Sequence, residues 1–210
     1  MRKRLTIAIC VAAALWFYMF SPWTSGLTNF WITMAVSALI LTSMALALQP
    51  AAMPKVEKPL LQLAGGVLVA LLLWGIFWVG DKASAWLFDF ARPEVDNIYA
   101  MKTGLPQWVI ALLLLLIIGP AEEFFWRGFV QRNMASVLGG ARHPETMAFM
   151  VTAAVYALVH VWSFNFMLVM AALVAGCVWG FLYLVCPKSL PALIISHALW
   201  DALVFVWMPI

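Results

Sequence analysis

The chain has 210 residues, of which 66% are hydrophobic and only 10% are charged. A soluble domain is usually about half apolar and about a quarter charged, so a water-soluble fold of this size could not cover so much apolar surface. The apolar composition therefore makes the lipid bilayer the expected surrounding. The net charge is +3, and the one dense basic run is Arg2-Lys3-Arg4, so the sequence has no basic patch of the kind that binds nucleic acid.

Apolar stretches long enough to cross a hydrocarbon core of about 30 Å recur along the sequence. We expect spans at residues 5–20, 27–48, 60–80, 107–129, 147–162, 166–185 and 190–207. The fourth is expected to continue as an amphipathic segment to about Leu138, and residues 83–91 could form a short interfacial helix. Bulky residues, with no small-residue cleavage site, end the first stretch, so we interpret it as a retained helix.

These elements predict an all-α, polytopic transmembrane bundle of about seven helices, or eight with the interfacial one. The sequence shows no internal repeat, so we expect one integral membrane domain over residues 1–210. Within it, residues 5–80 hold the N-terminal helices and residues 106–207 a core that carries the chemistry.

The Lys and Arg residues predict the orientation, because cytoplasmic segments carry an excess of both. With the N-terminus inside, the outside segments hold only Lys82, Arg92 and Lys102, and the connection at residues 81–105 and the C-terminus also lie outside. The inside segments then hold Arg2, Lys3, Arg4, Lys55, Lys58, Arg127, Arg132, Arg142 and Lys188.

Ionisable residues inside a span are costly and are therefore functional candidates. The first group lies in GPAEEFFWRGF, where Pro120 is expected to kink or open the helix just before two carboxylates. Glu122 and Glu123 point to different faces, since successive helical residues differ by about 100°. Glu123 and Arg127 have the i,i+4 spacing of an ion pair, which leaves Glu122 without a cation and suited to act as a general base. The alternative is a charged cluster that only holds helices together.

Two further groups carry the histidines of the spans. Tyr156 and His160 share a helix face, and helix lengths place His160 at a depth similar to that of Glu122. His197 and Asp201 are also i,i+4 neighbours, so a carboxylate could fix the imidazole tautomer. His197 lies closer to the start of its helix, which must begin earlier, tilt or be re-entrant. The alternatives are a satisfied core histidine and a His–Asp bridge between helices.

Three motifs in this order resemble the CPBP family of intramembrane proteases, which includes the type II CaaX prenyl proteases and bacteriocin-processing and immunity proteins. The motifs are EEFFWRG at residues 122–128, YALVH at 156–160 and HALWD at 197–201, within a resemblance covering about residues 110–206. The resemblance implies a glutamate-dependent peptidase whose site opens toward the cytoplasm in the prenyl-protease branch, which agrees with the orientation predicted above.

The resemblance also implies roles for single residues. Glu122 and His160 would activate water, and His197 and Asp201 would stabilise the oxyanion. The remaining motif residues would orient the site or bind substrate: Glu123, Arg127 and Tyr156. Tyr156 stands where phenylalanine is commoner in the family.

Asp201 stands where the prenyl proteases usually have asparagine, and an ionised aspartate cannot donate to an oxyanion. Asp201 must therefore be protonated or act by orienting His197. An aspartate at this position argues against the prenyl-protease branch. Glu122, His160 and His197 also form the ligand set of a hydrolytic zinc site. There is no HExxH pair, and we expect glutamate catalysis without a metal cofactor, with zinc on these three residues as the alternative.

We therefore expect an endopeptidase acting on a small membrane-associated or membrane-anchored peptide or protein, in a bacterial or archaeal cytoplasmic membrane. The expected partners are this substrate and the bilayer, with no nucleic acid, and no sequence feature indicates an oligomeric state. One alternative is a proton-coupled transporter or channel, because intramembrane Glu and His also relay protons. Another is a non-catalytic immunity or scaffold protein of the same fold.

Overall fold

The computed structural model describes residues 1–49 and 56–210, so Lys55 of the orientation prediction lies outside the described residues. In these two ranges every regular element is a helix. The elements are α1 (Arg2–Phe20), α2 (Phe30–Leu48), α3 (Pro59–Leu87), α4 (Ala91–Ala100), α5 (Gln107–Leu113), η2 (Leu114–Ile118), α6 (Gly119–Glu123), η3 (Phe124–Gln131), α7 (Arg132–Val137), α8 (Pro144–Leu158), η4 (Val159–Ser163), α9 (Phe166–Val185), η5 (Pro187–Ser189), α10 (Leu190–Ala202) and η6 (Leu203–Trp207).

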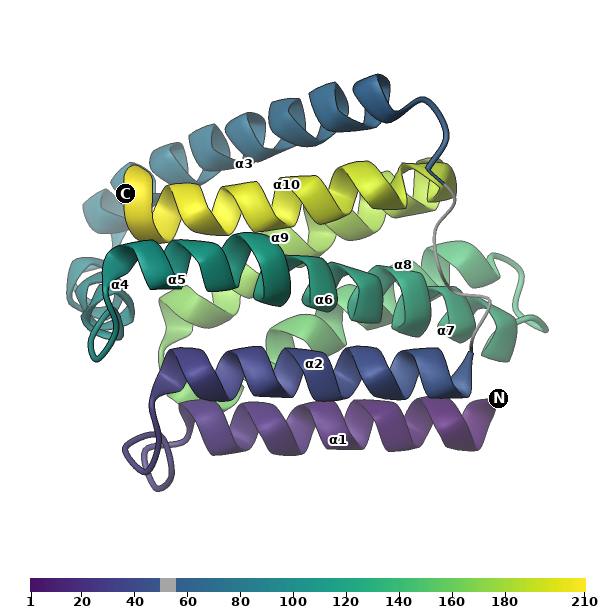
Figure 1. The fold of residues 1–210 in the computed structure, drawn as a ribbon, viewed down its shortest axis with the longest axis horizontal. Helices are drawn as coiled ribbons and strands as arrows, with labels where there is room; N and C mark the ends of the chain where they lie inside the picture. The colour runs from purple at the N-terminus through teal and green to yellow at the C-terminus, as the bar shows by residue number, and fades with distance from the viewer. Residues whose placement is uncertain (50–55) are drawn as a thin grey trace.

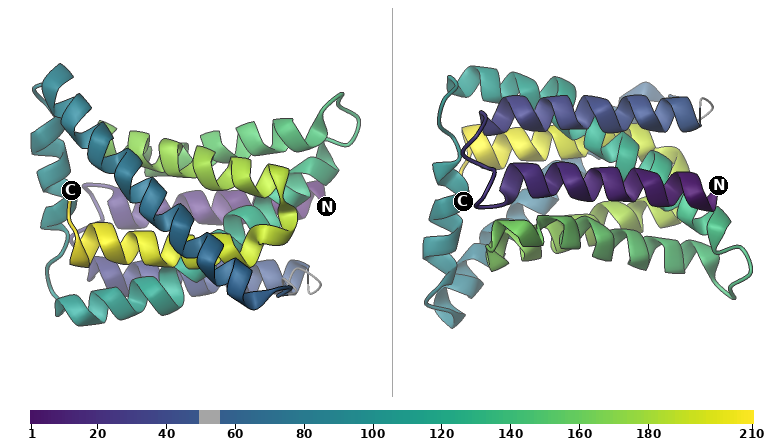
Figure 2. Two further views of the ribbon diagram at one scale, coloured as in Figure 1. Left: turned by 90° about the horizontal axis from the view of Figure 1, so that it is seen from above. Right: turned by 90° about the horizontal axis from the view of Figure 1, so that it is seen from below.

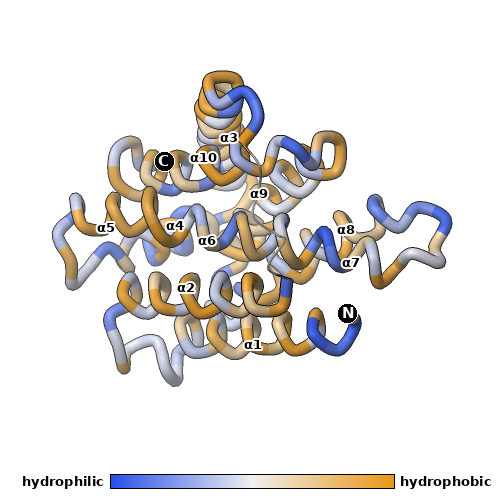
Figure 3. The backbone as a smooth tube through the Cα atoms, turned by 45° about the vertical axis from the view of Figure 1, so that its right-hand side comes forward, coloured by the Kyte–Doolittle hydropathy of each residue, from blue (hydrophilic) through white to orange (hydrophobic). Residues whose placement is uncertain are grey.

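Seven stretches of the described chain are long and apolar enough to cross a membrane. They are Arg2–Phe20, Phe30–Leu48, Pro59–Leu87, Gln107–Val137, Pro144–Ser163, Phe166–Val185 and Pro187–Trp207. This confirms the predicted all-α, polytopic bundle. Most of the helices lie roughly along one direction, and the two termini lie at opposite ends of the bundle (Figure 1). Hydrophilic residues gather mainly at the helix ends and connections (Figure 3).

The third helix and the short helix after it differ from the prediction. An interfacial helix over residues 83–91 is wrong, because α3 continues through Leu87 and the short helix is α4, at Ala91–Ala100. α3 ends where Phe88 adopts extended backbone, and Pro93 fits the first turn of α4, where its missing N–H has no intrahelical partner to lose. α4 crosses one end of the bundle beside the end of α3 (Figure 2).

The fourth span is one continuous helical path from Gln107 to Val137, which agrees with the predicted extension to about Leu138. Around Pro120 the path widens into π-helical turns, η2 before it and η3 after it. The N–H of Gly119 bonds to the carbonyl of Leu114, five residues back. Pro120 thus opens the helix rather than breaking it, and such widened turns are frequent at functional sites.

Small residues let α10 approach the fourth span closely. A Cβ added to Gly119 would lie 2.5 Å from Cα of Ala198, so the two backbones touch there. The connection between α9 and α10 ends well short of the α7–α8 turn (Figure 1). His197 therefore needs fewer residues to reach the level of the carboxylates, which explains its position near the start of α10.

Candidate active site

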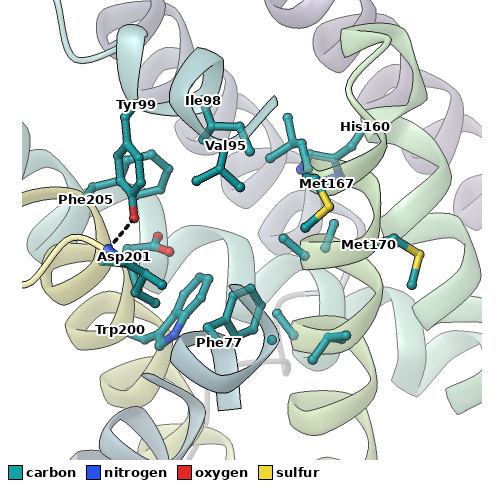
Figure 4. A pocket seen from close by; sticks show the side chains of 18 of the residues that line it. Phe77, Val95, Ile98, Tyr99, His160, Met167, Met170, Trp200, Asp201 and Phe205 are labelled. Atoms are coloured by element: carbon teal, nitrogen blue, oxygen red, sulfur yellow. Dashed lines mark hydrogen bonds between the residues drawn. The ribbon is translucent and has the colours of Figure 1, made fainter. Parts of the chain in front are cut away.

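A cavity of about 400 Å³ is lined by residues of α4 and of all seven spans. Its wall is mostly apolar, with Phe77, Val95, Ile98, Met167 and Met170 among the lining side chains (Figure 4). The four residues predicted to be catalytic all line this cavity: Glu122, His160, His197 and Asp201. The structure thus brings together residues from the fourth, fifth and seventh spans.

Glu122 reaches the cavity from α6 with a relative exposure of 3%. Its Oε2 accepts a hydrogen bond of 3.2 Å from the hydroxyl of Tyr156. In the described part of the chain no Lys, Arg or His nitrogen lies within ion-pair distance of this carboxylate. The predicted lack of a cationic partner for Glu122 is therefore what the structure shows.

Glu123 is fully buried and connects three elements. Its Oε2 accepts from Nη1 of Arg127 at 3.0 Å, which is the predicted i,i+4 ion pair, and lies 3.0 Å from Nδ1 of His197. The Glu123–His197 contact is not predicted from the sequence, because it depends on how α10 packs against α6. Glu123 thus ties the fourth span to the histidine of the seventh.

The guanidinium of Arg127 is held on several sides. Besides Glu123, it donates from Nη2 to the carbonyl of Gly176 at 3.2 Å. Its Cζ lies 5.0 Å from the ring centroid of Tyr156 and 5.5 Å from that of Trp179, within cation–π range. The guanidinium of Arg127 therefore connects α9 to Glu123.

His197 is fixed by three neighbours. Because a carboxylate only accepts, the Nδ1 atom facing Glu123 carries a proton. Nε2 lies 3.6 Å from Oδ2 of Asp201, the i,i+4 neighbour that the sequence indicated. The imidazole also stacks on Trp179, with centroids 3.9 Å apart and planes inclined by 18°. Trp179 is missed by sequence reasoning, since nothing in its spacing distinguishes it from other apolar residues of α9.

His160 lies where the helix tightens from α8 into the 3₁₀ turn η4. Its Nδ1 lies 2.8 Å from the carbonyl oxygen of Tyr156, which can only accept. Its Nε2 accepts from the indole N–H of Trp16 at 3.1 Å, which can only donate. One neutral tautomer, with the proton on Nδ1, satisfies both contacts.

The zinc alternative requires Glu122, His160 and His197 to direct their donor atoms at one point. Within residues 1–49 and 56–210, no three His, Cys, Asp or Glu side chains are grouped closely enough to hold a metal ion. Nε2 of His160 is directed at Trp16, and Nδ1 of His197 at Glu123. The lone pair on Nε2 of His160 is therefore taken by Trp16 and opposes zinc binding by this residue, whereas the contact of His197 with Glu123 leaves its Nε2 available.

The fold and site define a class: a helical membrane protein with buried carboxylates and imidazoles around an apolar cavity. Residues 104–203 match the family model described as type II CAAX prenyl endopeptidase Rce1-like, and this range contains every motif residue predicted for the site. The match supports the membership of the CPBP family that the motifs predicted, and with it a CAAX-type intramembrane endopeptidase in general. No curated protein and no solved structure matches the chain significantly.

Proposed function

We propose that the protein is a glutamate-type intramembrane endopeptidase that cleaves a membrane-associated or membrane-anchored peptide or protein. One observation carries the proposal: Glu122 faces an apolar cavity, without a cationic partner, while Glu123 beside it takes up the available cation. An unpaired carboxylate at a cavity wall is suited to accept a proton from water.

In the proposed reaction, Glu122 takes a proton from a water molecule as the water oxygen bonds to the carbonyl carbon of the scissile peptide. The carbonyl π electrons move onto oxygen and give a tetrahedral oxyanion. When this intermediate collapses, the C–N bond breaks and Glu122 returns the proton to the leaving amine. The hydroxyl of Tyr156 orients the carboxylate throughout, because it donates to Oε2.

His197 and Asp201 are proposed to stabilise the oxyanion. His197 is the donor in this proposal: its Nδ1–H is taken by Glu123, so it acts as an imidazolium, whose second proton, on Nε2, donates to the oxyanion. The 3.6 Å contact favours the second role foreseen for Asp201, which is to orient the imidazole. Glu123 and Arg127 are then positioning residues, which hold His197 at the cavity.

His160 is proposed to support water activation through Tyr156. The carbonyl of Tyr156 accepts from His160, and the hydroxyl of Tyr156 donates to Glu122, so Tyr156 links His160 to Glu122. Both imidazole nitrogens of His160 are engaged in hydrogen bonds, so Glu122 performs the proton transfer in this scheme. His160 stays neutral and keeps Tyr156 in place beside Glu122.

The proposed location is a bacterial or archaeal cytoplasmic membrane with the N-terminus in the cytoplasm. The run Arg2-Lys3-Arg4 lies at the terminus marked N, and α4 lies at the opposite end, near C (Figure 1). Residues of α4 line the cavity. With this orientation the cavity lies toward the outer face of the membrane, which differs from the cytoplasmic opening of the prenyl-protease branch.

The test uses the purified protein in proteoliposomes that carry single-span peptides with varied residues next to the apolar segment. Mass spectrometry detects cleavage, and a pH-sensitive dye inside the vesicles detects proton flux. We expect cleavage without flux. Flux without cleavage would contradict the proposal in favour of a transporter, and neither activity in folded protein would contradict it in favour of a scaffold.

A further inference from the structure

The indole of Trp16 lies outside the family-matched stretch, yet it contacts a predicted catalytic residue. Trp16 belongs to α1 and is separated from His160 by 144 positions in the chain. Its side chain is fully buried, and its N–H donates to Nε2 of His160 at 3.1 Å. The rings meet nearly edge to face, with centroids 5.9 Å apart and an interplanar angle of 82°.

We propose that Trp16 is a positioning residue of the active site, which holds His160 in the neutral tautomer with its proton on Nδ1. This inference rests on the proposed function for its catalytic meaning. The first helix then completes a site whose other predicted residues all lie within residues 104–203.

The contact does more than fill space, because its two partners select one proton arrangement. A second proton on His160 would place an N–H at Nε2 directly against the N–H of Trp16. A proton moved from Nδ1 to Nε2 would cause the same clash and would also set a lone pair against the carbonyl of Tyr156. Both alternatives leave buried polar groups unpaired, which is costly in an apolar surrounding.

The aromatic rings around His160 restrict the movement of its imidazole. Phe20, one turn after Trp16 on α1, has its ring centroid 5.4 Å from that of the imidazole. The ring of Tyr156 lies 5.3 Å away on another side. Because α1 supplies both Trp16 and Phe20, the orientation of His160 depends on how α1 packs against η4.

Trp126 provides a matched control. It is also fully buried, its ring lies 6.2 Å from that of Trp16, and its own N–H has no hydrogen-bond partner in the described residues. Trp126→Phe therefore removes a similar volume from the same aromatic cluster without removing a donor to His160. Comparison of Trp16→Phe with Trp126→Phe separates the hydrogen bond from packing.

The experiment measures the ring nitrogens of His160 by NMR in protein labelled with ¹⁵N-histidine. The chain has only three histidines, so a single His160→Gln sample assigns the signals. In the wild type we expect a protonated Nδ1 and a hydrogen-bonded, unprotonated Nε2. In Trp16→Phe the Nε2 signal should move to the position of a free imine nitrogen or split between tautomers, and in Trp126→Phe it should stay in place.

Unchanged His160 signals in folded Trp16→Phe would overturn the proposal, and so would a protonated Nε2 in the wild type. If Trp16→Phe does not fold, 3-benzothienylalanine at position 16 retains the shape and replaces N–H by sulfur, with the same signals expected to move. With a cleaved substrate, Trp16→Phe should lower kcat by up to roughly tenfold with little change in KM, as for loss of one neutral hydrogen bond that positions His160. A wild-type protein that cleaves nothing would contradict the proposed function, while the NMR result would still decide the role of Trp16.

Discussion

Glu122 and Glu123 are adjacent in the sequence and face two different surroundings. Glu122 lines the cavity and accepts one hydrogen bond, from the hydroxyl of Tyr156. Glu123 points away into the helix contacts, where one oxygen receives both Arg127 and His197. The two carboxylates lie between the widened helical turns on either side of Pro120. One motif therefore supplies both the proposed base, Glu122, and the residue that positions His197, Glu123.

Loss of the carboxylate at position 123 should act mainly on stability. Glu123→Gln leaves Arg127 buried without its counter-ion, and removal of one partner of a buried ion pair typically costs about 3–5 kcal/mol. Unfolding in detergent, followed by circular dichroism, measures the change. Asp89→Asn, at an exposed acidic residue, is the control, and an equal loss in both variants would contradict the structural role of Glu123.

Tyr156→Phe should reduce turnover without unfolding the protein. The variant retains the ring beside Arg127 and removes only the hydroxyl that donates to Glu122. A hydrogen bond to a charged group contributes about 1.5–3 kcal/mol, so we expect kcat to fall about tenfold to a hundredfold. Tyr18→Phe, on α1 and outside the cavity wall, should retain full activity. Wild-type kcat in Tyr156→Phe would show that this hydrogen bond is not used.

Gly119→Ala should separate the helices that form the site. The new methyl group would meet the backbone of Ala198, with 2.5 Å to Cα and 2.7 Å to N, so α10 would have to shift. Such overpacking typically costs about 1–3 kcal/mol, and the shift would also move His197 relative to Glu123. Gly75→Ala is the matched control, because nothing lies within 4 Å of a Cβ there. Equal stability and activity of the two variants would contradict this close approach.

Removal of metal ions should leave the activity unchanged. Nε2 of His160, which zinc would need, accepts from the indole of Trp16, and the proposed reaction uses Glu122 as the proton acceptor. Dialysis of the purified enzyme against a chelator, followed by cleavage assays, provides the measurement. An activity that disappears on dialysis and returns with zinc would overturn the metal-free reaction.

Several features could be predicted from the sequence because they depend on local spacing. The apolar runs define the seven spans, and i,i+4 spacing places Arg127 beside Glu123. The end of α3 could not be predicted, because residues 83–91 are compatible with either a continued helix or a new one. The observed helix continues to Leu87, and Arg92 of the next helix pairs with Asp81 at 3.0 Å.

The contacts between distant segments could not be predicted from sequence patterns. Trp16 and Trp179 resemble other aromatic residues of apolar helices, and only the packing of α1 and α9 brings them to the two histidines. The pairing of Glu123 with His197 likewise depends on the close approach at Gly119. Spacing within a helix identifies which residues share a face, and packing between helices determines what that face meets.

Cleavage of a membrane-anchored peptide by Glu122→Gln, compared with the wild type in the same proteoliposomes, tests the central claim most directly. Glu145→Gln, at an exposed acid in the first turn of α8, is the control. Positioned general bases contribute about 10²- to 10⁴-fold, so Glu122→Gln should lose at least about a hundredfold in kcat while it stays folded and inserted. Wild-type turnover by Glu122→Gln would contradict its role as the base.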